Sequence, residues 1–478
     1  MPKKICVNKG RIKEYCGLFG ICGNPEASSI AYLGLYALQH RGEESCGIVS
    51  SDGQEVYVHK AMGQVCDVFD EEKLRSLKGH MAIGHVRYST TGSSSVKNAQ
   101  PLFVDHLGGY FAIGHNGNLI NSYSLRKELE AEGSIFQTTC DSEIIIHLMA
   151  RSKHKDILEK LTSALKKIKG AYSLVIMTQG KIIGVRDPLG FRPLCLGKLK
   201  DNWCLASETC AFDLIEAKLE REVEPGEMVV IDGKDITSIK FDASKDRRAH
   251  CIFEHVYFSR PDSIVFGETV HLVRQKLGET LAKEHPVEAD YIIPIPDSGT
   301  SAALGFSHAS GIPLEQGVIR NHYVGRTFIQ PHQNIRDLGV RVKFNILKEV
   351  VKGKRVVIVD DSIVRGTTSR IRVKNFRNAG AKEVHMRIAC PPHKFPCFYG
   401  IDFPSKEELI ANRHSIEEIK KFLDVDSLGY LSLEGMLSSV KLPKNHYCAA
   451  CWTGDYPISV EDKKGKSVLE KGCGVNHG

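Results

Sequence analysis

The stretch Arg355–Ser369 constrains the fold of this chain more than any other segment. It reads RVVIVDDSIVRGTTS: a run of β-branched residues that ends in two acids, followed by a loop of Gly and Thr that opens a helical pattern over 367–378. Apolar runs of the same kind, at 291–296 and 383–388, stand before and after it. Strands that alternate with helices in this way predict a parallel sheet whose carboxyl edge carries the acids.

The loop after this strand has the chemistry of a phosphate site. The unpaired N–H groups and the dipole of a helix N-terminus favour an anion, and a Gly lets the backbone approach it. Asp360 and Asp361 can hold ribose hydroxyls and help to place Mg²⁺, an ion that keeps water and substrate phosphates as most of its ligands. The alternative is an ordinary turn between strand and helix with exposed acids.

The first half of the chain has a different rhythm, in which short β segments are separated by Gly and interrupted by helical patterns near 29–40 and 141–151. This mixture is typical of a layered α+β domain. The tetrapeptide AIGH occurs at 82–85 and again at 112–115. We interpret the pair as two strands that bring Arg87 and Asn116 to one end of a sheet, with chance similarity as the alternative.

A chain of 478 residues is too long for one compact core, so two or three domains are expected. The polar stretch 241–250, FDASKDRRAH, is the predicted boundary between them. Residues 405–440 are predicted to be largely helical, and the tail from Pro443 onward to be polar and weakly structured.

The net charge of +7 suits phosphorylated anionic substrates, and no Lys/Arg run is long enough to favour nucleic acid. No segment reaches the ~18 apolar residues of a membrane span. The N-terminus, MPKKICVNKGRIKEY, lacks the apolar core of a signal peptide, so a cytoplasmic protein is expected. The fifteen cysteines are an odd number in a large chain from a reducing compartment, which argues against a disulfide framework.

Cys16 opens the string CGLFGICG after fifteen residues of ordinary polar character. A cysteine that becomes N-terminal by cleavage carries its own general base, because the α-amine has a reference pKa of about 8. A purely structural cysteine at the start of a strand is the alternative.

Five strings follow in order: CGLFGICG, LQHRGEESCGIV, GHVRYSTTG, GHNGNL and TCDSE. Together with RDPLGFRPL and VEPGEMV they resemble the N-terminal-nucleophile glutamine amidotransferases. The resemblance implies an αββα sandwich, with a nucleophile, an oxyanion hole and a glutamine pocket. Matched by position, Cys16 is the nucleophile, Asn116 and Gly117 form the oxyanion hole, Arg41, Arg87 and Asp141 bind glutamine, and Tyr88 gates the pocket. Tyr15 stands where relatives with propeptides often carry an acidic residue.

The string around Asp360 resembles the phosphoribosyl pyrophosphate loop of the type I phosphoribosyltransferases. On that resemblance Asp360 and Asp361 contact ribose and metal, and Arg365, Gly366, Thr367 and Thr368 cradle the 5′-phosphate. The turn DSGTS after 291–296 matches the pyrophosphate-binding turn, with Ser298 near Mg²⁺. The run 320–331 matches a substrate loop, with Tyr323 and Arg326 at phosphoribosyl pyrophosphate, where it either couples the two sites or only covers its own substrate.

Cys448 and Cys451 form a C-x-x-C, which in a cytosolic chain indicates zinc, a redox pair or an iron–sulfur cluster. Cys251 and Cys397 stand in strings that resemble the iron–sulfur branch of the glutamine phosphoribosylpyrophosphate amidotransferases. The resemblance implies that these four cysteines hold a structural [4Fe–4S] cluster, whereas the nearby Cys390 does not match.

The combined resemblance covers nearly the whole chain. It implies a propeptide at 1–15, an α+β glutaminase domain at 16–240 and an α/β type I phosphoribosyltransferase domain at 241–478. It implies transfer of the glutamine amide nitrogen to phosphoribosyl pyrophosphate with Mg²⁺ and a [4Fe–4S] cluster, feedback by purine nucleotides and a homotetramer. Two alternatives are a glutaminase with another acceptor, such as a sugar phosphate or aspartate, and a non-enzymatic regulator that binds nucleic acid.

Overall fold

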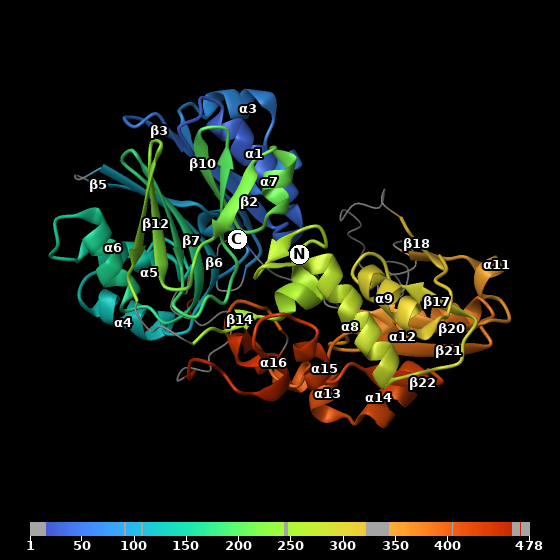
Figure 1. Ribbon diagram of the computed structural model, residues 1–478. Helices are drawn as coiled ribbons and strands as arrows, with labels where there is room; N and C mark the ends of the chain where they lie inside the picture. The colour runs from blue at the N-terminus through green and yellow to red at the C-terminus, as the bar shows by residue number, and fades with distance from the viewer. Residues whose placement is uncertain are drawn as a thin grey trace, which may run out of the picture.

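The computed structural model describes residues 16–89, 92–106, 109–242, 247–321, 344–403, 405–460 and 469. Within these ranges the chain forms two bodies that lie against each other, the first built by the N-terminal half and the second by the C-terminal half (Figure 1). No helix in the described ranges is long and apolar enough to cross a membrane.

The N-terminal body contains two antiparallel sheets, of seven and six strands. The first has the order β11 (Lys218–Glu222), β9 (Cys195–Leu199), β10 (Asn202–Ala206), β1 (Gly17–Cys22), β4 (Met81–Arg87), β2 (Ser45–Ser51), β3 (Val56–Met62). The second has the order β13 (Asp235–Lys240), β12 (Glu227–Asp232), β8 (Lys181–Arg186), β7 (Gly170–Thr178), β6 (Gly109–Leu119), β5 (Leu102–His106).

Three buried apolar clusters show how the layers stack. One lies between the two sheets and joins Leu18 and Ile83 of the first sheet to Val175 of the second. Another packs α1 (Ala27–Ala37), α2 (Val65–Val68) and α7 (Cys210–Leu214) on the outer face of the first sheet. A third packs α4 (Ser122–Ala131), α5 (Glu143–Ala150) and α6 (Ile157–Leu165) on the second. The order helix, sheet, sheet, helix is the predicted αββα sandwich.

The β segments of this half could be recognised in the sequence because several strands are covered on both faces. β2, β4 and β7 are buried along their whole length and therefore carry apolar side chains on both faces, with few charged residues to interrupt them. The helix α4 was missed because its short sequence, SYSLRKELEA, is rich in charged and polar residues. The two AIGH strands lie in different sheets, not one: β4 belongs to the first and β6 to the second. They face each other across the sandwich, where His85 Nε2 lies 3.0 Å from the His115 carbonyl oxygen.

The C-terminal body is built on a parallel sheet of four strands in the order β17 (Tyr291–Pro294), β20 (Arg355–Asp360), β21 (Glu383–Ile388), β22 (Ser427–Tyr430). α9 (Thr300–Ser310) packs on β17 and β20, and α12 (Thr367–Asn378) packs on β21. β20, α12 and β21 have the predicted bounds. The parallel sheet agrees with the α/β fold expected for this half.

The remaining elements of this body surround the sheet and the junction with the first. They are β14 (His250–Cys251), η3 (Glu254–Phe258), β15 (Ile264–Val265), β16 (Glu268–Thr269), α8 (Val270–Glu284), β18 (Val318–Arg320), β19 (Phe344–Ile346), α11 (Lys348–Val351), η4 (Lys406–Glu408), α13 (Ile410–Arg413), α14 (Ile416–Leu423), α15 (Leu433–Ser438), η5 (Lys444–His446), β23 (Tyr447–Cys448) and α16 (Ala450–Thr453).

Two predictions for this region need correction. Residues 405–440 contain β22 among their helices, a strand whose short sequence, SLGY, carries too few apolar residues to be recognised. The tail was expected to be weakly structured, but Tyr447–Cys448 pairs in parallel with His250–Cys251. This pairing ties the end of the second body to the segment that follows the first.

Candidate active site

Cys16 immediately precedes β1, a central strand of the first sheet that pairs with β10 and β4. The residue is buried, and its Sγ donates to the Tyr88 carbonyl oxygen at 3.7 Å. Burial raises the pKa of the Cys16 thiol to about 11, and the charge of Arg87 opposes that rise. The thiol therefore needs a base in order to attack at neutral pH.

Arg87 and Asp141 are both buried and both act electrostatically on the Cys16 thiol, which places the three residues together. Arg87 ends β4, and its Nη1 donates to the Ser93 carbonyl oxygen at 3.3 Å. The carboxylate of Asp141 accepts from the Leu119 N–H at 2.8 Å. Burial disfavours the charged form of Asp141. His115 and the hydrogen bonds from Leu119 and Ser142 outweigh the effect of burial and hold the pKa of the carboxyl below its ordinary value.

Asn116 and Gly117 lie on β6, which faces β4 across the sandwich. The Asn116 side chain is 1% exposed, and within the part of the chain that the structure describes its Nδ2 has no hydrogen-bond partner. Gly117 has a φ of +145°, and a Cβ at this position would lie 2.0 Å from the Ala171 carbonyl oxygen. Only glycine fits there. The side-chain amide of Asn116 is a buried hydrogen-bond donor, and an anionic oxygen could accept a hydrogen bond from it.

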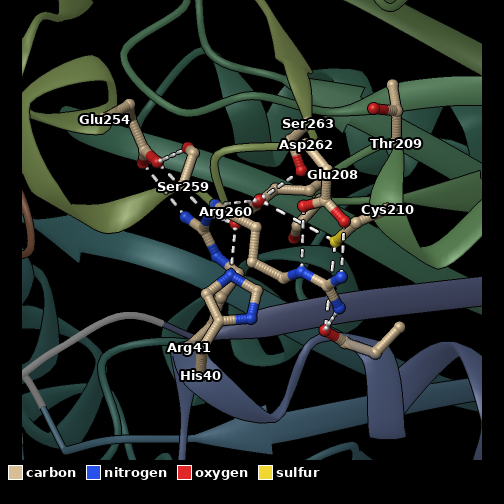
Figure 2. A network of polar contacts seen from close by, with 12 residues as sticks. His40, Arg41, Glu208, Thr209, Cys210, Glu254, Ser259, Arg260, Asp262 and Ser263 are labelled. Atoms are coloured by element: carbon tan, nitrogen blue, oxygen red, sulfur yellow. Dashed lines mark hydrogen bonds and ion pairs between the residues drawn. The ribbon is translucent and has the colours of Figure 1, made fainter. Parts of the chain in front are cut away.

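The guanidinium of Arg41 belongs to a network of buried charges with Glu208 and Glu254 (Figure 2). Its Nε donates to the Cys16 carbonyl oxygen at 3.2 Å, its Nη1 bonds Glu208, and its Nη2 donates to Glu254 at 3.0 Å. Glu254 also accepts from Arg192 at 3.3 Å. Arg41 was predicted to support the glutamine pocket, and its donors here serve two carboxylates and the backbone carbonyl of Cys16.

Glu208 and Glu254 were not singled out from the sequence, although each is an acid inside a largely apolar string, WCLASETC and HCIFEHVYF. A charge in such a run is a signal of a buried pair, because an unpaired buried charge costs several kcal/mol. Glu208 follows β10 in the first body, and Glu254 begins η3 in the second. The network therefore joins the two bodies at the residue that carries the thiol.

The second group of predicted residues lies at the carboxyl edge of the parallel sheet. Two loops meet there: the Ile295 N–H donates to the Val359 carbonyl oxygen at 3.0 Å, and a Cβ on Gly299 would lie 2.4 Å from the same oxygen. Ser298 is half-buried in the first loop, and Asp360 and Asp361 begin the second. The turn and the paired acids are thus neighbours.

Within the second loop, Gly366 has a φ of +74° and immediately precedes α12. Thr367 is exposed, and Thr368 is half-buried. Arg365 donates from Nη2 to Glu408 at 2.9 Å. The Asp360 carboxylate is bound by Arg372, and burial together with Asp361 raises the pKa of Asp360 above its ordinary value. The Asp361 carboxylate accepts from the Ser362 hydroxyl.

Cys251, Cys397, Cys448 and Cys451 converge from three segments that are far apart in the sequence. Cys251 and Cys448 are register partners in the β14–β23 pair. The thiols of Cys251, Cys397 and Cys448 all raise the pKa of Cys451, after burial as the first cause. Cys397, Cys448 and Cys451 are free thiols. No group of three or more His, Cys, Asp or Glu within the described ranges is arranged to hold a single metal ion.

Three predicted positions lie outside the described residues: Tyr323 and Arg326 of the substrate loop, and the segment 1–15 with Tyr15. Their roles stay predictions. Tyr88 lies next to the nucleophile, with its carbonyl oxygen facing the Cys16 thiol. Cys390, which was set apart from the four cysteines, is buried with its Sγ 3.8 Å from His393 Nε2.

Comparison with known proteins agrees with both halves of this description. A glutamine amidotransferase domain model matches residues 85–213. The chloroplastic amidophosphoribosyltransferase of Glycine max is 52% identical over 95% of this chain and 80% of its own length. The amidophosphoribosyltransferase of Methanocaldococcus jannaschii is 50% identical over 94% of this chain and 99% of its own.

A solved structure shares the fold along the chain. The glutamine phosphoribosylpyrophosphate amidotransferase from B. subtilis, complexed with ADP and GMP, has a TM-score of 0.89 and 48% sequence identity. The match covers 94% of this chain and 98% of that one. Similarity at this level over both bodies shows that the chain belongs to the amidophosphoribosyltransferase family of enzymes.

Proposed function

We propose that this enzyme carries out its reaction at the two sites described above, with Cys16 at the first and the paired acids Asp360 and Asp361 at the second. The enzyme transfers the amide nitrogen of glutamine to 5-phosphoribosyl 1-pyrophosphate. The products are 5-phosphoribosylamine, glutamate and pyrophosphate, and the step is the first of de novo purine synthesis. The observation that carries the assignment of the first site is the buried group of Cys16, Arg87 and Asp141, in which both charged side chains act on the thiol.

Cys16 attacks the amide carbon of glutamine and forms a thioester, and the proton taken from the thiol leaves with the amide nitrogen as ammonia. Water then cleaves the thioester, which releases glutamate and restores the thiol. Because burial raises the pKa of this thiol to about 11, the attack requires proton removal. Cleavage between Tyr15 and Cys16 supplies the base, since the freed α-amine has a reference pKa of about 8. We therefore propose that 1–15 is a propeptide and that the active chain begins at Cys16.

The groups around Cys16 match the charges of glutamine and of its tetrahedral intermediate. Arg87 offers a planar fork for the α-carboxylate, and Asp141 offers a negative charge for the α-ammonium. The unpartnered Nδ2 of Asn116 and the N–H of Gly117 bind the oxyanion, an interaction whose loss costs about 10²–10³ in rate. Arg41 is assigned here as a positioning residue for the Cys16 backbone, not as a contact of glutamine.

At the second site, Asp360 and Asp361 bind the ribose hydroxyls, and Arg365 with residues 366–368 binds the 5′-phosphate. Ammonia then displaces pyrophosphate from C1. Gly366 at the start of α12 is suited to the phosphate, because its backbone can approach closely where N–H groups converge. The turn 297–300 binds the pyrophosphate group. Tyr323 and Arg326 also contact phosphoribosyl pyrophosphate.

Mg²⁺ would be held at the edge of the parallel sheet. Asp360, Asp361 and Ser298 would supply its oxygen ligands, and few protein ligands are needed because this ion keeps water and substrate phosphates. When bound, Mg²⁺ makes pyrophosphate a better leaving group.

The four cysteines fit a [4Fe–4S] cluster, which takes four thiolates. Two observations support this proposal: Cys251 and Cys448 are register partners in the β14–β23 pair, and the thiols of Cys251, Cys397 and Cys448 all act electrostatically on Cys451. The cluster would tie residues 251 and 397 to the tail, a structural role.

We also propose that purine nucleotides inhibit the enzyme and that it assembles as a homotetramer. The first of these is supported by the B. subtilis relative, which was solved with ADP and GMP.

Glutamate release from glutamine, measured with and without phosphoribosyl pyrophosphate, tests the proposed function. We expect release in both conditions, and pyrophosphate in amounts equal to glutamate once phosphoribosyl pyrophosphate is present. An enzyme with another acceptor would release no pyrophosphate, and a regulator would release no glutamate. The intact mass of the anaerobically handled protein reports loss of the propeptide and the four bound irons in the same experiment.

A further inference from the structure

A short segment of the C-terminal body, Cys397–Gly400, reaches the strand of the N-terminal body that carries the oxyanion residues. The Nδ2 of Asn118 donates to the Phe398 carbonyl oxygen at 2.9 Å. A Cβ placed on Gly400 would lie 3.0 Å from the Gly117 carbonyl carbon and 3.1 Å from its Cα and its oxygen. The backbone of Gly400 is thus packed directly on the Gly117 peptide.

The residue between these two contacts holds the segment in place. Tyr399 is 2% exposed, and its ring stacks on Phe191 with the centroids 4.4 Å apart. Its carbonyl oxygen accepts from Arg192 at 2.7 Å, and its hydroxyl donates to the Ile458 carbonyl oxygen at 2.6 Å. A segment held by stacking on one body and by hydrogen bonds to both cannot shift without breaking several contacts.

Gly117 is also confined by β7, where a Cβ would meet the Ala171 carbonyl oxygen at 2.0 Å. Its backbone therefore packs closely on both β7 and the segment 397–400. Such confinement matters for an oxyanion donor, which must stand within ~2.7–3.1 Å of a charge that exists only during the reaction. Donors that are fixed beforehand need no rearrangement as that charge forms.

We propose that Cys397–Gly400 is a positioning element that holds Asn116 and Gly117 in the geometry of the oxyanion hole. The inference rests on the proposed function, because it assumes that these two residues form that hole. It assigns to the phosphoribosyltransferase half a part in the chemistry of the glutaminase half: the first site is complete only when the second body packs against it.

Gly400→Ala tests the inference with one added methyl group. The methyl pushes on the Gly117 peptide, and a misplacement of about 1 Å can cost about 10²-fold in rate. We expect kcat for glutamine hydrolysis to fall by about tenfold to 10²-fold, with little change in KM for glutamine. Ammonia-dependent synthesis, which does not use Cys16, should stay near the wild-type rate.

Gly53→Ala is the matched control. Gly53 has a φ of +96°, close to the +103° of Gly400, and a Cβ there would have no neighbour within 4 Å. Both variants therefore bear the backbone strain of an alanine at positive φ, but only Gly400→Ala adds a contact. Gly53→Ala should keep the wild-type kcat with glutamine.

Alkylation of Cys16 by iodoacetamide, followed by peptide mass mapping, separates positioning from general damage. This displacement forms no oxyanion, so its rate should be equal in Gly400→Ala and the wild type. Asn118→Ala removes the hydrogen bond to Phe398 without adding bulk and should lower kcat in the same direction by a smaller factor. It also provides the test if Gly400→Ala does not fold.

Asn116→Ala distinguishes failure of the inference from failure of the proposed function. If Asn116→Ala loses glutamine hydrolysis while Gly400→Ala and Asn118→Ala keep the wild-type kcat, the inference is wrong and the oxyanion hole stands. If Asn116→Ala hydrolyses glutamine at the wild-type rate, the proposed oxyanion hole is wrong. Equal loss of glutamine-dependent and ammonia-dependent synthesis in Gly400→Ala would also overturn the inference, because the segment would then serve folding alone.

Discussion

Arg41 Nε donates to the carbonyl oxygen of Cys16 at 3.2 Å. The same guanidinium is bound by Glu208 of the first body and by Glu254 of the second. The nucleophile's backbone is therefore held by a cation whose own position depends on both halves of the enzyme. Burial disfavours the charge of Arg41, but the two glutamates outweigh that cost and raise its pKa above the ordinary value.

Arg41→Lys keeps the charge but loses the planar fork that reaches three acceptors at once. We expect glutamine-dependent kcat to fall by about 10²-fold because Cys16 is displaced, while ammonia-dependent synthesis is largely retained. Steady-state kinetics with each nitrogen donor measure this difference. Arg75→Lys is the control, because Arg75 forms an exposed pair with Glu71 at 2.9 Å and should tolerate the change. Wild-type glutamine turnover in Arg41→Lys would contradict the positioning role.

Glu208 should make the enzyme lose stability in acid. Burial opposes its charge, but His40 and Arg41 outweigh burial and hold the pKa of this carboxyl well below its ordinary value. A carboxyl with a lowered pKa in the folded state adds stability above the unfolded pKa of about 4.3, and that stability is lost as the pH falls further. In Glu208→Gln the melting temperature should be lower at pH 7 and should fall less steeply between about pH 5 and 3 than in the wild type. Equal slopes would contradict the assignment.

Much of the second body could be predicted because local sequence and fold agree there. The β-branched run before Asp360 can only be a buried strand, and Gly366 with two threonines can open a helix. The individual motifs around Cys16 were likewise recognisable. The packing between distant segments could not be predicted. No local pattern relates Arg41 to Glu254 or Gly117 to Gly400, and none shows that the strands at Ala82 and Ala112 belong to different sheets.

Asp361→Asn should separate the two sites. Asp361 is the better choice than Asp360, whose carboxylate is already bound by Arg372 inside the body. Removing a charge from the ribose and metal contacts should reduce synthesis with either nitrogen donor, while basal glutamine hydrolysis persists. Glutamate and pyrophosphate release are measured side by side. Equal loss of both would mean that the acid supports the fold.

Cys448→Ser should prevent assembly of the cluster, because metal-binding energy is folding energy in such a site. We expect little soluble protein, without bound iron or the brown colour of the wild type. Cys390→Ala is the matched control: its thiol also acts on Cys451 but lies outside the four assigned ligands. That variant should keep four irons, measured by elemental analysis and visible absorption. Full activity in a colourless zinc-containing enzyme would overturn the assignment.

We propose that Cys16 is the nucleophile for glutamine and that the phosphoribosyl site can use ammonia without it. Synthesis of 5-phosphoribosylamine by Cys16→Ala, measured once with glutamine and once with ammonia, tests both statements. We predict no activity with glutamine and near wild-type activity with ammonia. Glutamine-dependent synthesis at the wild-type rate in this variant would contradict the account.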